Sequence, residues 1–135
     1  MTDPEPPLVL VVDDYPDTLE MYAECLRVSG FRVAEARTGL EAVARARALR
    51  PAAVLMDLSL PGIDGWEATR QLKSVPGTAH IPVVAITGHA SPVAWDQARD
   101  AGCAAFVLKP ALPDDVVREI RRVLDGAAAP RGPDR

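Results

Sequence analysis

The chain has 135 residues, of which 48% are hydrophobic and 25% charged, and its net charge is −4. This is the size and composition of one globular domain, and it argues against a disordered or fibrous chain. The acidic balance offers no basic footprint for a phosphate backbone, and no apolar run approaches the ~20 residues that cross a bilayer. We therefore expect no direct binding of nucleic acid and no attachment to a membrane.

Five short apolar runs alternate with longer segments of helical period. The runs predict strands at residues 8–12, 31–36, 52–56, 83–87 and 105–108. Several runs are apolar without alternation, as expected for parallel strands that helices cover on both faces. Arg32 and Glu35 interrupt the second run, which predicts an edge strand there.

The segments between the runs carry start and stop signals for helices. Pro16 and Asp17 open the first helix, and Gly30 suits a left-handed cap at its end. Thr38, with Glu41 three residues later, forms a capping box that opens the second. Comparable signals predict three more helices, at residues 65–74, 92–102 and 113–124.

The second predicted helix holds the nearest approach to a basic patch in the chain. Its arginines are Arg45, Arg47 and Arg50. We interpret them as a solvated helix face. Three apolar residues of the same helix are expected to face the core: Leu40, Val43 and Ala44.

The strict alternation of five strands with five helices predicts an α/β fold built from βαβ units. Right-handed crossovers then give a doubly wound parallel sheet with helices on both faces. In such sheets, ligands bind outside the carboxyl ends of the strands. We expect an N-terminal extension at residues 1–7, one domain at 8–125, and a tail at 126–135 that is a frayed end or the start of a linker.

Polar residues stand at the ends of four of the runs. Asp13 and Asp14 follow the first, Asp57 the third and Lys109 the fifth, while Thr87 closes the fourth. Two adjacent carboxylates near a third repel one another unless a proton or a cation compensates them. Mg²⁺ takes carboxylates, waters and phosphate oxygens as ligands. The pattern therefore predicts a phosphoryl-transfer site, with one carboxylate as nucleophile and a lysine and a hydroxyl for the phosphoryl oxygens.

The chain resembles the receiver domains of response regulators in two-component signalling, over nearly all of residues 8–124. The motifs that carry the resemblance are VVDDYPD, VLMDLSLPGIDG, AITGHA and FVLKP, in this order. The resemblance implies a flavodoxin-like (βα)5 sandwich whose five parallel strands have the order 2-1-3-4-5. It also implies a signalling protein rather than an enzyme, with only self-catalysed phosphoryl transfer and autodephosphorylation.

By this resemblance, Asp57 is the phosphoacceptor and takes a phosphoryl group from a phosphohistidine of a histidine kinase or a histidine phosphotransfer protein. The implied cofactor is Mg²⁺, bound directly by Asp14, by Asp57 and by the backbone carbonyl of Ser59. Asp13 would act on the metal largely through a coordinated water. Lys109 would pair with Asp57 and then with a phosphoryl oxygen.

The resemblance also implies a switch, in which the Thr87 hydroxyl is drawn toward the phosphoryl group and Phe106 turns into the vacated space. The response would reach the face made by the fourth helix, fifth strand and fifth helix, where an output protein or domain, or a second copy in a homodimer, would bind. Pro110 takes the cis-proline position that aims Lys109. Ser59 and His89 would tune the access of hydrolytic water and so the lifetime of the phosphoryl group.

Competing functions stay open at this point. An aspartate-nucleophile phosphatase would also need Asp57, Mg²⁺ and a lysine. The motif of such enzymes, however, has two aspartates separated by one residue, whereas Asp13 and Asp14 are adjacent. A nucleotide or flavin module is disfavoured because no glycine-rich phosphate loop follows the first strand. A degenerate receiver that acts only as a scaffold would not need Asp14, Asp57, Thr87 and Lys109 together.

The context of the domain also stays open. The chain could be a stand-alone regulator or a receiver excised from a hybrid histidine kinase. Its two cysteines, Cys25 and Cys103, have no metal-ligand spacing, and the N-terminal MTDPEPPL lacks the basic start and apolar core of a signal peptide. These features favour a reducing cytoplasm.

Overall fold

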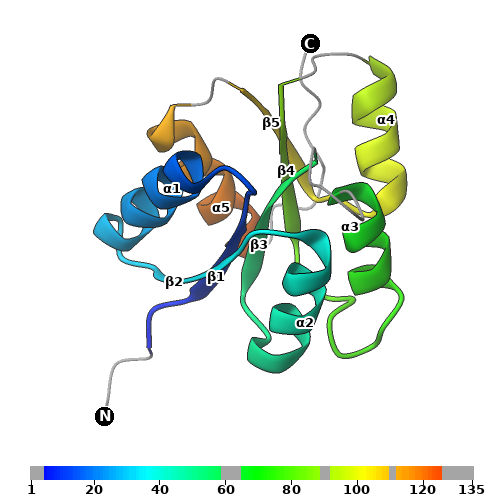
Figure 1. Ribbon diagram of the computed structural model, residues 1–135, viewed down its shortest axis with the longest axis horizontal. Coiled ribbons are helices and arrows are strands. Elements are labelled where there is room, and N and C mark those ends of the chain that lie inside the picture. Colours follow the sequence, from blue (N-terminus) through cyan, green and yellow to red (C-terminus); the bar gives the residue numbers. More distant parts are fainter. Residues whose placement is uncertain (1–4, 59–64, 89–91, 110–111, 126–135) are drawn as a thin grey trace.

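The structure, a computed structural model, describes residues 5–58, 65–88, 92–109 and 112–125. Strands and helices alternate along the chain, as the sequence predicts (Figure 1). The strands are β1 Leu8–Val12, β2 Arg32–Ala36, β3 Ala53–Asp57, β4 Val83–Thr87 and β5 Ala105–Leu108. The helices are α1 Pro16–Val28, α2 Gly39–Leu49, α3 Gly65–Lys73, α4 Pro92–Ala101 and α5 Pro113–Leu124. β2 and β3 each begin one residue later than predicted, and β3 extends to Asp57.

The strands form one parallel sheet in the order β2-β1-β3-β4-β5, which confirms the predicted fold class and strand order. β2 lies at an edge, as its charged residues indicate. The register pairs Val12 with both Ala36 and Met56, and Thr87 with Leu108. The carboxyl ends of all the strands therefore meet at one edge of the sheet.

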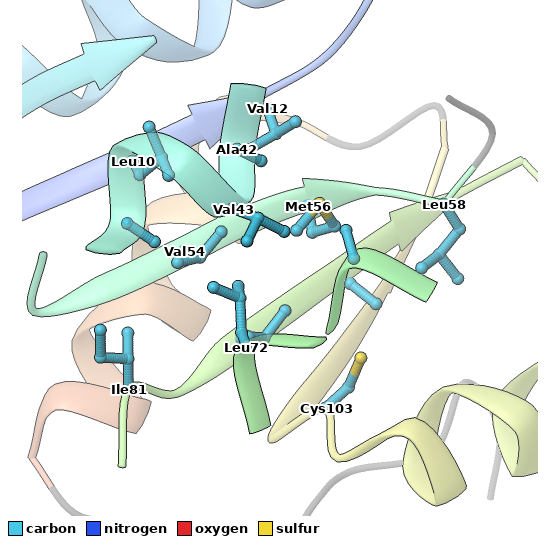
Figure 2. Packing of buried hydrophobic residues seen from close by; sticks show 14 of the residues in the cluster. Leu10, Val12, Ala42, Val43, Val54, Met56, Leu58, Leu72, Ile81 and Cys103 are labelled. Carbon is cyan, nitrogen blue, oxygen red and sulfur yellow. The ribbon is translucent and has the colours of Figure 1, made fainter. Parts of the chain in front are cut away.

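Helices cover both faces of the sheet: α1 and α5 pack on one face, and α2, α3 and α4 on the other (Figure 1). Alternate residues of each strand enter the two cores, as the two-residue period of a strand requires. In β3, Leu55 joins the core under α1 and α5, and Met56 joins the opposite core. Figure 2 shows the second core, where Val43 of α2 and Leu72 of α3 pack with Met56 of β3.

The first helix follows its sequence signals. Pro16 occupies the first turn, where its missing N–H leaves no hydrogen bond unmade. Gly30, just beyond the end of α1, has φ +100°, a conformation that glycine adopts without strain. The four residues of α1 that the helical spacing turns inward are buried: Leu19, Tyr22, Ala23 and Leu26.

The second helix begins at the predicted residue, but its buried face differs from the predicted one. The hydroxyl of Thr38 accepts a hydrogen bond from the backbone N–H of Glu41 (3.1 Å), and Oε1 of Glu41 accepts one from the backbone N–H of Arg37 (2.6 Å). The prediction that Leu40 and Ala44 face the core is wrong, because Leu40 is 65% exposed and Ala44 is also exposed.

The reason lies in the phase of the helix. The row that packs inward consists of residues spaced by three and four, most of them small: Gly39, Ala42, Val43 and Ala46. Leu40 lies one position, about 100°, around the helix from this row. Val43 alone of the three predicted inward residues is buried.

None of the helices in the described ranges combines the length and the apolar composition that a membrane crossing requires.

Candidate functional site

The carboxyl edge of the sheet positions the polar residues that follow the strands. Main-chain hydrogen bonds continue past the strand ends: the N–H of Asp13 donates to the carbonyl of Ala36 (3.1 Å), and the N–H of Lys109 donates to the carbonyl of Thr87 (2.7 Å). Asp57 is the last residue of β3 and pairs with Ile86 of β4. The backbone at the site is therefore held by the sheet itself.

One lysine lies between two buried carboxylates. The Nζ of Lys109 is 3.2 Å from Oδ2 of Asp57 and 3.6 Å from Oδ2 of Asp13. Asp13 is 1% exposed and Asp57 3% exposed, whereas the side chain of Lys109 is 30% exposed. The structure thus brings together three residues that the sequence analysis singled out, with the ammonium group at the rim and the carboxylates beneath it.

The third acid of the predicted set completes a group that could hold a metal ion. Carboxylate oxygens of Asp13, Asp14 and Asp57 all lie within 4.8 Å of one another. Oδ1 of Asp13 accepts a hydrogen bond from the N–H of Tyr15 (2.9 Å), while its buried Oδ2 has no hydrogen-bond partner among the described residues. Converging carboxylate oxygens with spare acceptor capacity fit a hard cation such as Mg²⁺. A Mg²⁺ site at such an acidic pocket is what the resemblance to receiver domains implies.

The pKa values of two side chains show how the charges act on one another. Burial raises the pKa of Asp13, as does the nearby carboxylate of Asp57, although the hydrogen bond from Tyr15 opposes them. Burial lowers the pKa of Lys109, but Asp57 and Asp13 outweigh it and the pKa is raised. Lys109 therefore stays protonated at neutral pH. The three carboxylates around it outnumber its single positive charge, and a bound cation would balance the excess.

Thr87 and Phe106 lie on the face of the sheet that α2, α3 and α4 cover. Thr87 is 2% exposed and Phe106 is 6% exposed. Phe106 pairs with Ala85, which precedes Thr87 by two residues in β4 and therefore shares its face of the sheet. Both residues thus belong to the α2-α3-α4 side of the sheet. The predicted residues Ser59, His89 and Pro110 lie outside the described residues.

Sequence reasoning missed one residue that supports the site. Gly65, the first residue of α3, lies so close to β3 that a Cβ atom there would overlap the carbonyl oxygen of Asp57 and lie 2.7 Å from the Cα of Leu58. From the sequence, Gly65 was only the first residue of a predicted helix. Its position eight residues after Asp57 in the sequence gave no sign of this contact.

A second missed neighbour is Tyr22 of α1. It lies on the buried face of α1 and is 3% exposed. Burial raises the pKa of its phenol, and the charges of Lys109, Asp13 and Asp57 also act on it, Lys109 in the opposite direction. The phenol therefore lies within electrostatic reach of the site, although no sequence signal distinguishes it from an ordinary core aromatic.

Comparison with known proteins assigns the chain to a class. The response regulator receiver domain family matches residues 9–121, which is most of the chain. The chain therefore belongs to the response regulator receiver domain family, as its sequence motifs indicate. It is a receiver domain of two-component signalling, a class of signalling proteins rather than of enzymes in the usual sense.

Individual relatives agree with this assignment. The polar-differentiation response regulator DivK of Brucella anthropi is 34% identical over 122 residues, which cover 90% of this chain and 99% of DivK. A CheY-like receiver domain protein of Methanospirillum hungatei superimposes with a TM-score of 0.83 at 26% identity, covering 90% of this chain and 95% of the other. The receiver domain of a signal transduction histidine kinase from Syntrophus aciditrophicus gives 0.82 at 28% identity, covering 89% and 91%.

Proposed function

We propose that Asp57 of this chain accepts a phosphoryl group from the phosphohistidine of a histidine kinase or a histidine phosphotransfer protein. The observation that carries the proposal is the 3.2 Å contact between Lys109 Nζ and Oδ2 of Asp57, which belongs to the three-carboxylate cluster. In the step, a carboxylate oxygen of Asp57 attacks phosphorus and the new O–P bond replaces the P–N bond, while the phosphohistidine ring, protonated at its other nitrogen, leaves as neutral imidazole.

The residues around Asp57 would then take the roles that the resemblance to receiver domains implies. Asp14 and Asp57, with the backbone carbonyl of Ser59, would bind Mg²⁺, and Asp13 would hold one of its waters. Bound Mg²⁺ supplies positive charge that neutralises the phosphoryl oxygens. Lys109 balances the carboxylate of Asp57 before transfer and pairs with a phosphoryl oxygen after it.

The same event would set the signalling state. Phosphorylation adds about −1.5 to −2 charges and three acceptor oxygens. The hydroxyl of Thr87 turns toward them, and Phe106 fills the space that Thr87 leaves. The change alters the α4-β5-α5 face, which binds an output protein or domain or a second copy of the chain. Pro110 aims Lys109, while Ser59 and His89 set the access of water.

The relatives support more than one context for such a domain. The Brucella relative is a response regulator that matches this chain over 99% of its own length, whereas the Syntrophus domain belongs to a histidine kinase. A stand-alone regulator and a receiver from a hybrid kinase both fit the phosphoacceptor role. We place the domain in the cytoplasm, where a kinase of either kind would phosphorylate it.

The proposal is tested by Mg²⁺-dependent transfer of labelled phosphate from a panel of histidine kinases. The parent and an Asp100→Asn control, altered at an exposed acid of α4, should be labelled, and Asp57→Asn should not. If Asp57→Asn is labelled as strongly as the parent, Asp57 is not the phosphoacceptor. Steady turnover of a simple phosphomonoester would instead favour an aspartate-nucleophile phosphatase.

The role of Ser59 and His89 has its own test. Exchanging both residues should change the rate of autodephosphorylation while phosphorylation of Asp57 is retained. An unchanged rate in the double variant would show that these positions do not control the lifetime of the phosphoryl group.

A further inference from the structure

The arginines of residues 37–50 differ from the other arginines that the structure describes. Elsewhere in the described ranges, six arginines lie within 4.0 Å of a carboxylate: Arg27, Arg32, Arg70, Arg99, Arg118 and Arg122. Arg121 donates to the carbonyl of Ser29 (2.9 Å) and stands over the ring of Phe31. Within residues 37–50, by contrast, no arginine side chain forms an ion pair with a described residue: Arg37, Arg45, Arg47 and Arg50.

This segment is a positive region on a negative protein. Residues 37–50 contain four arginines and a single acid, Glu41, so they carry a net charge of +3, whereas the whole chain carries −4. Glu41 is already used by the cap of α2, where it accepts a hydrogen bond from the backbone N–H of Arg37. The guanidinium groups are therefore available to carboxylates of another molecule.

The outer side of α2 gives these arginines a defined setting. Leu40, Ala44 and Ala48 are exposed and spaced by four residues, so they form a ridge along the helix. Arg45 and Arg47 are also exposed, and the helical period places them on opposite flanks of this ridge. We call these five residues the α2 surface. Its small central side chains allow another chain to approach closely between two cations.

The α2 surface is separate from the other surfaces of the domain. α2 packs against α3 and the β1–β2 side of the sheet. In Figure 1, α1 and α5 lie on the opposite face of the sheet. The helix begins near the carboxyl edge, after β2, and runs away from it. A molecule bound along α2 would therefore leave the α4-β5-α5 face uncovered.

The chemistry of the surface selects its partner. Nucleic acid without sequence preference is bound by many cations together with aromatic side chains that stack on bases, and α2 contains no aromatic residue. A membrane requires a broad apolar face, whereas the apolar row of α2 is buried and Leu40 is the one large apolar residue of the α2 surface. Carboxylates match guanidinium groups in charge and in geometry.

We propose that the α2 surface docks an acidic helix of a partner protein, with glutamate or aspartate side chains on Arg45 and Arg47 and a small apolar ridge against Ala44 and Ala48. The interaction does not depend on phosphorylation of Asp57. It would give the domain a second protein contact, which selects the partner by charge complementarity.

The test uses a fluorescein-labelled amphipathic helix that has alanine and leucine on its ridge and glutamate on both flanks. Its counterpart has lysine in place of glutamate. Fluorescence anisotropy should show binding of the acidic helix to the parent, weakening as salt is added. The variant Arg45→Glu/Arg47→Glu should bind about tenfold more weakly, because two attractions become repulsions.

A matched control separates the α2 surface from net charge. Arg99→Glu/Arg118→Glu makes the same charge change at two exposed arginines of α4 and α5, and its affinity should stay within about twofold of the parent. Circular dichroism checks that both variants are folded.

Three results would overturn the proposal. The first is an equal loss of affinity for the acidic helix in the two double variants. The second is equal affinity for the acidic helix and its lysine counterpart. The third is tighter binding of duplex DNA or of phosphatidylserine vesicles through Arg45 and Arg47. Phosphorylation of Asp57 by a kinase should be unaffected by Arg45→Glu/Arg47→Glu, so a failure here is distinct from a failure of the phosphoacceptor role.

Discussion

Gly65 packs directly against the main-chain carbonyl of Asp57, so the start of α3 and the end of β3 touch at the proposed phosphoacceptor. The backbone N–H of Gly65 also donates a long hydrogen bond to the carbonyl of Leu58 (3.4 Å). The two contacts leave no space for a side chain at position 65. The backbone of Asp57 is thus supported from outside the sheet as well as by its neighbours within it.

We expect Gly65→Ala to destabilise the domain by about 1–3 kcal/mol, since the added methyl group overlaps backbone atoms that cannot turn away. The higher helix propensity of alanine would return at most about 1 kcal/mol. Urea unfolding measures the net loss.

Gly88→Ala is the matched control, because a Cβ at position 88 meets nothing within 4 Å and the backbone there needs no left-handed conformation. Its stability should stay within about 0.5 kcal/mol of the parent. Equal stability of Gly65→Ala and the parent would mean that α3 moves away from Asp57 at little cost.

Asp13 should make stability depend on pH in the absence of metal. Burial raises its pKa in the folded protein above the ordinary value of 3.8. At a pH above the pKa of Asp13 in the folded protein, the ionised carboxylate lowers the free energy of unfolding. This penalty disappears as the pH falls from that pKa toward 3.8, the ordinary value. Asp13→Asn removes the penalty while Oδ1 can still accept the hydrogen bond from Tyr15.

We therefore expect Asp13→Asn to stabilise the protein at pH 7 in EDTA, with a gain that shrinks as the pH approaches 4. Urea unfolding at several pH values measures this gain, and Asp100→Asn, at an exposed position, should show none of it. A loss of stability at pH 7 would show that the ion pair between Asp13 and Lys109 outweighs the burial of the carboxylate.

Much of the architecture could be predicted because it depends on local patterns. The apolar runs identified the strands, Arg32 identified the edge, and Pro16 and Gly30 identified the ends of α1. The phase of α2 was missed because Leu40 is strongly apolar, whereas the row that packs inward consists mostly of small residues, Gly39, Ala42 and Ala46.

The candidate site could be predicted as a set of residues but not as a geometry. Shared strand ends indicated that Asp13, Asp57 and Lys109 converge. The position of Lys109 between the two carboxylates depends on the register across β4 and on a residue 52 positions away. The contact between Gly65 and Asp57 likewise depends on how α3 docks, which no local pattern encodes.

The two cysteines should differ sharply in reactivity. Burial raises the pKa of Cys103 to about 11, partly opposed by a hydrogen bond with Thr69, and the residue is 4% exposed. Burial also raises the pKa of Cys25, but that residue is only partly buried. Because the thiolate is the reactive form, iodoacetamide at pH 8 should modify Cys25 first.

Peptide mass spectrometry measures the two rates. In Cys25→Ser, modification of Cys103 should be slow in buffer and fast in urea. Equal rates for the two thiols in the native parent would contradict the burial of Cys103 beneath α3 and α4.

Asp14 and Asp13 should differ in their contribution to Mg²⁺ binding. Asp14 is exposed and can enter the shell of a cation directly. In Asp13, Oδ1 accepts a hydrogen bond from the N–H of Tyr15, and Oδ2 is buried 3.6 Å from the ammonium of Lys109. We expect Asp14→Asn to weaken Mg²⁺ binding by more than about tenfold, and Asp13→Asn, which would lose a water-mediated contact, to weaken it less.

Calorimetric titration with Mg²⁺ measures both losses. Asp17→Asn, at an acid of the first turn of α1 outside the three-carboxylate cluster, is the control and should bind as the parent does. The rise in unfolding temperature with added Mg²⁺ gives an independent reading, because a ligand of the folded state stabilises it by mass action. Equal losses in the two variants, or a larger loss in Asp13→Asn, would show that the buried acid is a direct ligand and that the metal lies deeper, beside Lys109.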